Sequence, residues 1–425
     1  MASEDIVVGL EIGTSKVCAV VGEARHDGTI KVLGVGQAPS RGVRKGEIVD
    51  FDTAGKCVRE ALADAEEKSD VMIRSVFLAV TGAHIESFNN RGAVGVPEDR
   101  EEICEEDFED VQAAAREVSL PAPNIFLHSI LQHYYVDGQD GILNPIGMMG
   151  TKLEADFHII HGVGTRIKNS VRCVKELDIE VEDVVFAPIA AAQVVLDLNQ
   201  RNQGALVVDM GGGTTGYVVY SDAVVQQSGC LAVGGDHITN DISLGLRIPM
   251  ARAERLKIEE GSVIIGQSLP GASVVLKDET GFAGREIERE MLNTIINCRV
   301  RETFELLKRE LDDASQLDFL AAGMLLTGGC SMLKGIDHLA EEVFGIPVHL
   351  THAQTVSGIT SAFENPQFST AIGLIKYAQS MQGEKRRGGL LRRIWKKLPF
   401  VNSWLLPALL FFSDRFSTNP FNILL

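Results

Sequence analysis

The sequence lacks the features that would assign it to a secreted or disulfide-bonded class. Its seven cysteines are scattered, odd in number and without a C-x-x-C pair, which indicates reduced thiols in a cytosolic protein. No basic region precedes the first apolar run, so no secretory signal peptide is expected. A Walker loop or a dinucleotide fingerprint would run from a strand into a helix, and no such strand-to-helix pattern is found.

Positive charge is scarce outside one segment. The 425 residues carry a formal net charge of −18, but residues 385–425 contain eight Lys and Arg and one acid, which leaves −25 for the rest. An acidic body repels nucleic acid, so no nucleic-acid partner is expected, and only the basic segment could bind an anionic surface. A length of 425 residues with 45% apolar and 23% charged residues is typical of a globular protein with two or more domains.

A glycine-rich turn between two apolar runs is the most informative stretch of the chain. The run 206–208 ends on Asp209, continues through Gly211, Gly212, Gly213 and Thr214, and is followed by a second apolar run. This pattern predicts a strand, a tight turn and a strand. Glycines let a backbone approach a phosphate and present N–H groups to it, and the carboxylate suits a divalent cation bound through water. The alternative is a hairpin without a ligand.

The same arrangement occurs near the N-terminus, at residues 6–21. Glu11 stands where Asp209 stands, and Gly13 stands where Gly211 stands. The turn continues through Thr14, Ser15 and Lys16, and an apolar run follows. Two phosphate-type hairpins far apart in one chain predict two similar lobes around one nucleotide.

Other stretches predict the remaining elements. Helices are expected over residues 52–69, 250–260 and 286–311, where apolar residues recur at helical spacing. Residues 98–110 contain nine acids and one Arg, which favours a solvated helix. Strand-like runs at 125–135 and 153–161 indicate an inserted module. Glycine pairs that could offer backbone N–H groups to a ligand follow at Gly234-Gly235 and Gly328-Gly329.

Taken in order, these motifs resemble the five signature segments of the actin/Hsp70/sugar-kinase superfamily. The segments are Glu11-x-Gly13-Thr14-x-Lys16, the run 187–191, Asp209-x-Gly211-Gly212-Gly213-Thr214, Thr327-Gly328-Gly329 and the run 371–373, with Glu254-x-x-Lys257 beside them. Within the superfamily the chain resembles the bacterial cell-division FtsA family. The resemblance rests on residues 9–17 and 39–46, on the position of the inserted module and on the basic amphipathic C-terminal stretch.

The resemblance implies an α/β, actin-like, two-lobed ATPase fold with duplicated βββαβα cores and an inserted FtsA-type (SHS2-like) subdomain. The implied divisions are 4–83, 166–195 and 367–380 for the first lobe, 84–165 for the inserted subdomain, 196–235 and 311–366 for the second lobe, 236–310 for its small subdomain, 381–388 for a linker, 389–400 for a membrane helix and 401–425 for an apolar tail.

The resemblance also implies ATP and Mg²⁺ as cofactors. The implied nucleotide-binding residues are Gly13, Thr14, Ser15, Lys16, Asp209, Gly211, Gly212, Gly213, Thr214, Gly234, Gly235, Glu254, Lys257, Gly328 and Gly329. Glu11 and Asp209 would hold the metal, through water. Several hydrolytic relatives carry an acid where this chain has Ala187, which can neither orient water nor accept a proton. At most slow hydrolysis is therefore expected, and no residue is assigned a catalytic role.

The implied function is that of an adaptor that ties the FtsZ ring to the cytoplasmic face of the membrane at the division site. Implied partners are the C-terminal peptide of FtsZ, further copies of the chain in filaments, an anionic lipid membrane and later division proteins. Arg299 and Glu302 lie one turn apart on the predicted helix 286–311 and resemble the family's peptide-binding pair, with Arg301 as the alternative contact.

Residues 389–400 predict a membrane-surface helix. At about 100° per residue the apolar and basic side chains fall on opposite faces. The apolar face is Leu390, Leu391, Ile394, Trp395 and Leu398, and the basic face is Arg392, Arg393, Lys396 and Lys397. The alternative is a helix that docks on the protein's own core. Residues 401–425 depart from the family pattern and are read either as extra interfacial anchoring or as a frame-shifted end.

Three competing functions remain open. A small-molecule kinase would need a catalytic carboxylate beyond the metal-site acids, and an Hsp70-like chaperone would need a peptide-binding domain after residue 374. An MreB-like or pilus-assembly actin is the closest competitor. The module at 84–165 and the C-terminal position of the basic helix favour FtsA over it.

Overall fold

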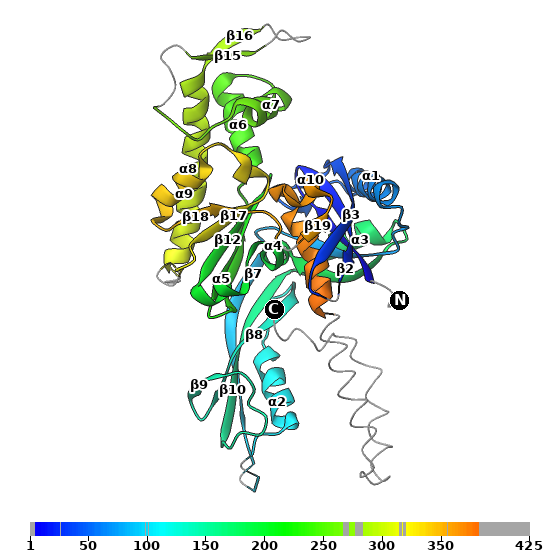
Figure 1. Cartoon of the computed structure of the whole chain (residues 1–425), viewed down its shortest axis with the longest axis vertical. Helices are drawn as coiled ribbons and strands as arrows, with labels where there is room; N and C mark the ends of the chain where they lie inside the picture. Colours follow the sequence, from blue (N-terminus) through cyan, green and yellow to red (C-terminus); the bar gives the residue numbers. More distant parts are fainter. Residues whose placement is uncertain are drawn as a thin grey trace.

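Two lobes and a projecting module make up the molecule (Figure 1). The computed structural model describes residues 5–381 apart from residues 26, 98, 101, 267–271, 277–283, 314–316, 318–319 and 355. The predicted membrane helix at 389–400 and the apolar tail at 401–425 lie outside the described residues. Among the described residues, no helix combines the length and the apolarity needed to cross a bilayer.

The first lobe is built on a six-stranded sheet in the order β11-β6-β1-β2-β3-β19. Its strands are β1 (Asp5–Ile12), β2 (Lys16–Ala24), β3 (Ile30–Pro39), β6 (Ser75–Val80), β11 (Glu180–Phe186) and β19 (Val356–Gly358), and the short pair β4 (Val43–Arg44) and β5 (Glu47–Ile48) follows β3. The accompanying helices are α1 (Phe51–Ser69), α3 (Gly164–Lys175), α4 (Ala187–Val195), α10 (Thr360–Phe363), the 3-10 turn η3 (Pro366–Phe368) and a helix over residues 369–381. Helix α5 (Leu198–Gln203) lies against the second lobe.

Helix α1 shows how the sequence sets one of these elements. Asp50 caps its first turn by accepting a hydrogen bond from the Thr53 N–H at 3.2 Å. Its buried face is the apolar stripe that the spacing predicts, including Val58 and Leu62. The helix lies against β3 at Gly36, where a Cβ atom would overlap the carbonyl oxygen of Ala61. The predicted helix over 52–69 is confirmed.

The second lobe repeats the topology of the first. Its sheet has the order β14-β13-β12-β17-β18, so that β12, β13 and β14 correspond to β1, β2 and β3, while β17 and β18 correspond to β6 and β11. The strands are β12 (Ala205–Met210), β13 (Thr215–Ser221), β14 (Val224–Leu231), β17 (Met324–Thr327) and β18 (Val348–Leu350). The 3-10 turn η2 (Gly329–Met332) and helix α9 (Ile336–Phe344) connect β17 to β18. The predicted duplication is confirmed.

A small subdomain stands at the far end of the second lobe, at the top of Figure 1. It contains α6 (Gly235–Leu246), α7 (Met250–Glu260), the hairpin of β15 (Ser273–Leu276) and β16 (Arg285–Glu288), and the long helix α8 (Arg289–Asp313). The expected helix over 286–311 begins later, because residues 285–288 pair with β15 as a strand. A stripe of α8 that includes Leu292, Val300 and Leu307 is fully buried.

The inserted module is a four-stranded antiparallel sheet with one helix. The sheet has the order β7-β10-β8-β9, with β7 (Ile85–Gly95), β8 (Asn124–Val136), β9 (Gln139–Ile142) and β10 (Lys152–Val163), and α2 (Glu105–Arg116) covers it. The expected helix over 98–110 is wrong in position. Asp107 accepts a hydrogen bond from the Cys104 N–H at 2.9 Å and pairs with Arg100, so the helix is capped there and begins at Glu105.

Side chains of the module cover the edge strand of the second lobe. Ser87, Asn89 and Gln132 donate hydrogen bonds to the backbone carbonyl oxygens of Ser228 (2.7 Å), Gln226 (3.1 Å) and Val225 (2.6 Å) in β14. An edge strand carries unpaired backbone groups that need partners when buried. The module supplies partners to three β14 carbonyl groups.

Two buried histidines join the module to the two lobes. His158 lies between Asn89 and Ser228, with its Nε2 2.9 Å from the Ser228 hydroxyl of the second lobe. His128 accepts a hydrogen bond from the Phe186 N–H of the first lobe at 2.9 Å. Burial lowers the pKa of His158 to about 3 and that of His128 to about 4. Both rings are therefore neutral at pH 7.

We expect this neutral pair to make folding pH-dependent. When the pKa of a histidine is lower in the folded than in the unfolded state, the folded protein becomes less stable as the pH falls below 6.5. The loss approaches about 1.4 kcal/mol per pH unit for each ring. His158→Gln should therefore lose about 1 kcal/mol less stability than wild type between pH 6.5 and 5.5, because the unfolded ring is half protonated at pH 6.5; urea unfolding measures this. His349→Gln, at an exposed ring in β18, is the control. An unchanged slope for His158→Gln would contradict this account.

Candidate functional site

The two glycine-rich turns meet between the lobes. In the first turn the Gly13 N–H donates to the Lys16 carbonyl at 3.0 Å, and in the second the Gly211 N–H donates to the Thr214 carbonyl at 2.9 Å. The same hydrogen bond thus closes both turns, as their matching sequences predict. A Cβ atom at Gly213 would overlap the side chain of Thr14, so glycine is required for this approach.

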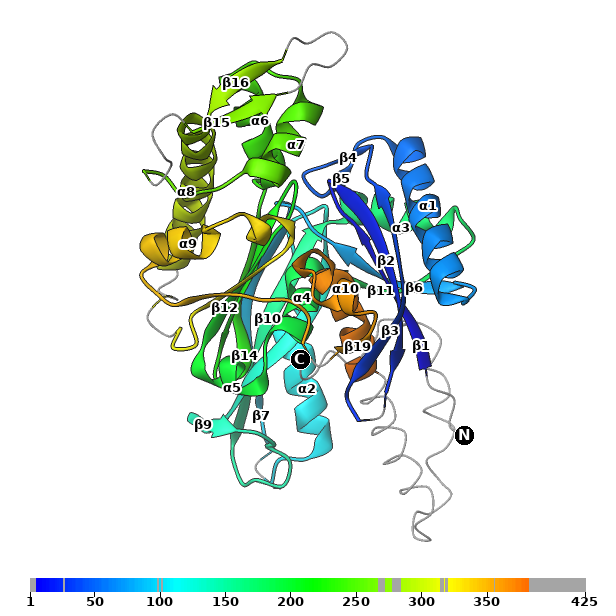
Figure 2. The ribbon, with the colours of Figure 1, turned by 45° about the horizontal axis from the view of Figure 1, so that its top comes forward.

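A cavity of about 80 Å³ lies where the turns meet. Both sheets contribute to it, and helices α4 and α10 lie between the two sheets (Figure 2). The lining consists of Glu11, Gly13, Thr14, Ser15, Lys16, Thr81, Asp209, Gly211, Gly212, Gly213, Thr214, Gly328, Gly329, Pro366, Gln367 and Thr370. Most of the residues predicted from sequence to contact phosphate are therefore brought together.

Glu11 and Asp209 are the two carboxylates of this cavity. Burial raises the pKa of Glu11 to about 7, with the charge of Lys16 lowering it and that of Asp209 raising it further. Burial also raises the pKa of Asp209, against a 2.7 Å hydrogen bond from the Thr370 hydroxyl and the charge of Lys16. Within the described residues the buried Oε2 of Glu11 has no hydrogen-bond partner. Such an oxygen fits a cation or its water.

The donor set at this place suits magnesium better than a metal that needs many protein ligands. No group of three or more His, Cys, Asp or Glu side chains suited to a metal is present in the part of the chain that the structure describes. Magnesium usually binds through one or two carboxylates together with water and phosphate oxygens. Glu11 and Asp209, one from each lobe, match that requirement.

Lys16 is held at the edge of the cavity by three groups. Its ammonium donates to the backbone carbonyl of Gln367 in η3, lies 4.8 Å from the centre of the Phe368 ring and is 4.0 Å from Glu11. A carbonyl and a ring face are weak partners for a full charge compared with a phosphate oxygen. The ammonium is thus placed to exchange them for an anion.

Four of the residues expected to bind the nucleotide, Gly234, Gly235, Glu254 and Lys257, are not part of the cavity lining. The N–H groups of Gly235 and Asp236 donate to the carbonyls of Gly211 (3.0 Å) and Gly212 (2.7 Å), which joins α6 to the turn. In α7, Lys257 is buried and pairs with Glu254 at 2.7 Å. Its ammonium also donates to Gly235 and Thr239, at 3.1 and 2.9 Å. Lys257 therefore binds the start of α6.

Sequence reasoning missed three polar residues of the cavity: Thr81, Gln367 and Thr370. Thr81 directly follows β6, which is parallel to β1 and so ends at the same edge of the sheet as Glu11. Thr81 could have been predicted as a site residue from this parallel pairing. Thr370 directly precedes the expected segment 371–373, but no sequence pattern shows that its hydroxyl reaches Asp209.

Ala187 begins α4, with Pro188 as the second residue of the helix. Pro188 lies against β13, since a Cβ atom at Gly216 of that strand would be 2.5 Å from its Cγ. Phe186 and Ala187 are both buried and apolar. Glu11 and Asp209 are thus the only carboxylates that line the cavity within the described residues.

The predicted peptide-binding pair lies on α8, away from the cavity. Arg299 donates to Asp241 of α6 at 2.5 Å and also pairs with Glu302. Half of the Glu302 side chain is exposed (54%), against 26% for Arg299. Arg301, the alternative contact, pairs with Glu342 of α9 at 3.0 Å.

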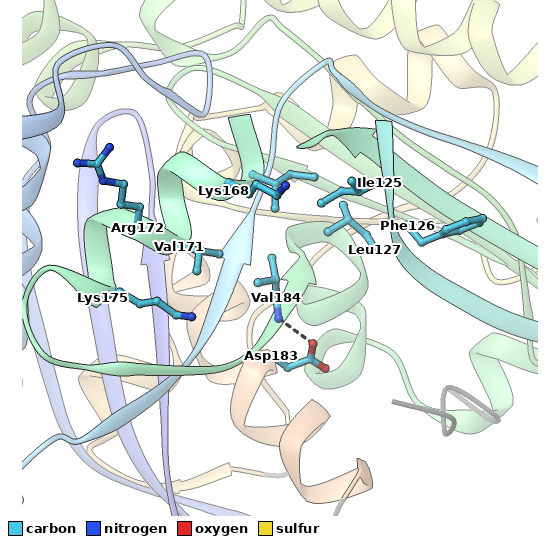
Figure 3. Close-up of a pocket in the computed structure, with 10 residues that line it drawn as sticks. Ile125, Phe126, Leu127, Lys168, Val171, Arg172, Lys175, Asp183 and Val184 are labelled. Atoms are coloured by element: carbon cyan, nitrogen blue, oxygen red, sulfur yellow. Dashed lines mark hydrogen bonds between the residues drawn. The ribbon is translucent and has the colours of Figure 1, made fainter. Parts of the chain in front are cut away.

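A larger cavity of about 350 Å³ lies elsewhere, between α3, the start of β8 and β11 (Figure 3). Its floor is apolar, with Ile125, Leu127 and Val184, and basic side chains of α3, Lys168, Arg172 and Lys175, stand around it. It contains none of the residues that the sequence predicted for a site. Polar and charged residues predicted for a site line the small cavity between the turns instead.

We expect Glu11→Gln to stabilise the protein without nucleotide or divalent cations. A carboxyl pKa raised from 4.5 to about 7 gives stability at low pH that is lost as the pH rises toward 7. At 1.36 kcal/mol per unit the gain for the variant is at most about 3 kcal/mol at pH 8 and under about 1 kcal/mol at pH 5. Urea unfolding in EDTA measures it, with the exposed Glu117→Gln as the control. An equal gain in stability at pH 5 and pH 8 would refute the raised pKa of Glu11.

Comparison with protein families gives two matches, one over the second lobe with its small subdomain and one over the module. Residues 206–373 match the model described as cell division protein FtsA, and residues 82–161 match the model described as the SHS2 domain inserted in FtsA. The module that interrupts the first lobe is thus of the SHS2 type.

Curated relatives match over nearly the whole chain. The cell division protein FtsA of Pseudomonas aeruginosa is 35% identical over 382 residues, which cover 90% of this chain and 91% of that protein. The cell division protein FtsA of Escherichia coli K12 is 34% identical over 419 residues, which cover 94% and 97%. Identity at this level over this length establishes common descent.

Solved structures at lower identity show the actin-like fold. The PilM–PilN type IV pilus biogenesis complex has a TM-score of 0.60 at 16% identity, covering 87% of this chain and 97% of that one. MreB5 of Spiroplasma citri bound to ADP has a TM-score of 0.51 at 14% identity, covering 90% and 98%. With the curated relatives and the family models, the conclusion is that this chain belongs to the FtsA family of actin-like bacterial cell-division proteins.

Proposed function

We propose that this protein binds ATP with Mg²⁺ between its two lobes and ties the FtsZ ring to the cytoplasmic face of the membrane. The observation that carries the nucleotide site is the meeting of two equivalent glycine-rich turns, with one lysine and a carboxylate from each lobe. MreB5, which has the same fold, is solved with ADP. Backbone N–H groups of glycine turns bind phosphate oxygens, and Lys16 adds a point charge.

Entry of a nucleotide requires the lobes to separate. The cavity between the turns is about 80 Å³, well below the roughly 300–1,000 Å³ of sites for small organic ligands. Separation at the Gly213–Thr14 contact would enlarge it, and Lys16 would exchange the Gln367 carbonyl for a phosphate oxygen. Magnesium held by Glu11 and Asp209 would neutralise part of the phosphate charge.

Hydrolysis is proposed to be slow. Attack on a terminal phosphate needs a residue that orients water. Ala187 and Phe186 occupy the place where several hydrolytic relatives carry an acid, and both side chains are apolar and buried. The protein thus acts principally as an ATP-binding assembly protein, with self-association into filaments and contact with later division proteins as its further roles.

We expect wild type to bind ATP in the presence of Mg²⁺ and Asp209→Ala to lose the dependence on Mg²⁺, because the variant lacks one of two metal-site carboxylates. Isothermal titration with and without EDTA measures this. Asp312→Ala, at an exposed position of α8, should bind like wild type. Absence of ATP binding by wild type would refute the nucleotide site. Turnover of many per second, typical of dedicated enzymes, would refute the assembly role.

The tether needs two attachments, one to FtsZ and one to lipid. Arg299 and Glu302 of α8 are proposed to receive the C-terminal peptide of FtsZ, because an Arg guanidinium binds carboxylates in bidentate fashion. A bound carboxylate would replace or share the contact with Asp241. The lipid attachment is proposed for the amphipathic stretch 389–400, where basic residues favour an anionic surface.

We expect the two attachments to fail separately in vesicle flotation. Wild type should float with anionic vesicles and carry FtsZ with it, while a chain truncated after Gln382 should remain at the bottom. Arg299→Ala should float but leave FtsZ behind, because its lipid attachment is intact. Arg309→Ala, an exposed arginine of the same helix, should float and carry FtsZ. Flotation of the truncated chain, or full capture of FtsZ by Arg299→Ala, would contradict the respective attachment.

A further inference from the structure

The segment 365–370 contacts both lobes at the cavity. The Gln367 carbonyl accepts from Lys16 of the first turn, and the Thr327 hydroxyl at the end of β17 lies 2.8 Å from the Ser369 hydroxyl. Ser369 and Thr370 begin the helix over residues 369–381, and both are buried at 1–2% exposure. A helix that covers the first lobe therefore begins on groups of the nucleotide site.

Thr370 fixes one oxygen of Asp209. Its hydroxyl donates to Asp209 Oδ2 at 2.7 Å, and this is the only side-chain hydrogen bond to Asp209 among the described residues. Oδ1 lies against Gly328, which has a φ of 87° and where a Cβ atom would overlap this oxygen. The carboxylate is thus held between a hydroxyl and a glycine, which leaves Oδ1 as the oxygen that can serve a cation.

Glu11, the other carboxylate of the cavity, has no comparable support. Its Oε2 is buried without a hydrogen-bond partner within the described residues, and Lys16 is 4.0 Å from it. The first lobe thus supplies a carboxylate whose orientation is open. The second lobe supplies one whose orientation is set by a residue of the closing helix.

We propose that Thr370 is the positioning residue of the metal site: its hydroxyl orients Asp209 so that the nucleotide is bound with its divalent cation. This inference rests on the proposed nucleotide binding and deepens it. Groups that hydrogen-bond a metal-binding carboxylate commonly change metal affinity by about 10- to 100-fold when they are removed. The helix over 369–381 then contributes to the metal site through the orientation of Asp209.

The test compares Thr370→Val with Thr370→Ser. Valine keeps the shape of threonine and removes the hydroxyl, whereas serine keeps the hydroxyl. Affinity for a fluorescent ATP analogue is measured in Mg²⁺ and in EDTA. Thr370→Val should weaken binding about tenfold in Mg²⁺ and less than about twofold in EDTA. Thr370→Ser should return the Mg²⁺ affinity to within about threefold of wild type.

The control is Thr303→Val. Thr303 is fully buried in α8, and its hydroxyl donates to the Arg299 carbonyl at 2.9 Å. The Thr303→Val variant therefore measures how a buried Thr→Val change far from the site affects nucleotide affinity. Equal weakening of Thr370→Val in Mg²⁺ and in EDTA would overturn the proposal and indicate a structural role. Unchanged affinity in both would overturn it as well.

Wild type separates the failure of this inference from the failure of the proposed function. If wild type binds no nucleotide, the nucleotide site is wrong and the positioning role falls with it. If wild type binds equally in Mg²⁺ and EDTA, the metal site is wrong. If wild type prefers Mg²⁺ and Thr370→Val retains that preference in full, only the role of Thr370 is wrong.

Discussion

The close approach of two glycine turns is the constraint on which the structure depends. At Gly213 no side chain fits, because the side chain of Thr14 fills the space from the opposite lobe. This contact brings the ends of β1 and β12 together, and Glu11 and Asp209 with them. Two carboxylates and a lysine therefore lie in one small cavity, which presents both signs of charge. The duplicated sheets provide rigid supports for the turns.

The inserted module limits how the lobes move. It holds the first lobe through His128 and the Phe186 N–H, and the second through His158 and Ser228. Both rings belong to one sheet, so that a separation of the lobes must bend this sheet or break one of the histidine contacts. Neutral, buried and hydrogen-bonded rings resist exchange with water. The module thus restrains the same lobe separation that the proposed entry of a nucleotide requires.

The local sequence pattern predicted those elements whose formation depends on residues close together in the chain. The two strand–turn–strand units, the helix α1 and most of α8 follow from alternation, glycine and helical spacing. The position of α2 did not follow, because a composition of acids does not reveal that Asp107 turns back to cap Cys104. Thr370 and Asp209 are separated by 161 positions in the chain, so only the folded backbone shows that they meet.

The cover over β14 has a consequence for assembly. Sheet edges are where proteins add strands from other chains, and this edge already has Ser87, Asn89 and Gln132 on three of its carbonyl oxygens. A strand from a neighbouring molecule would have to displace all three. Growth of a polymer through a continuous intermolecular sheet is thus blocked at this end of the second lobe. Copies of the chain that join there must do so through side-chain surfaces, which favours reversible contacts over amyloid-like ones.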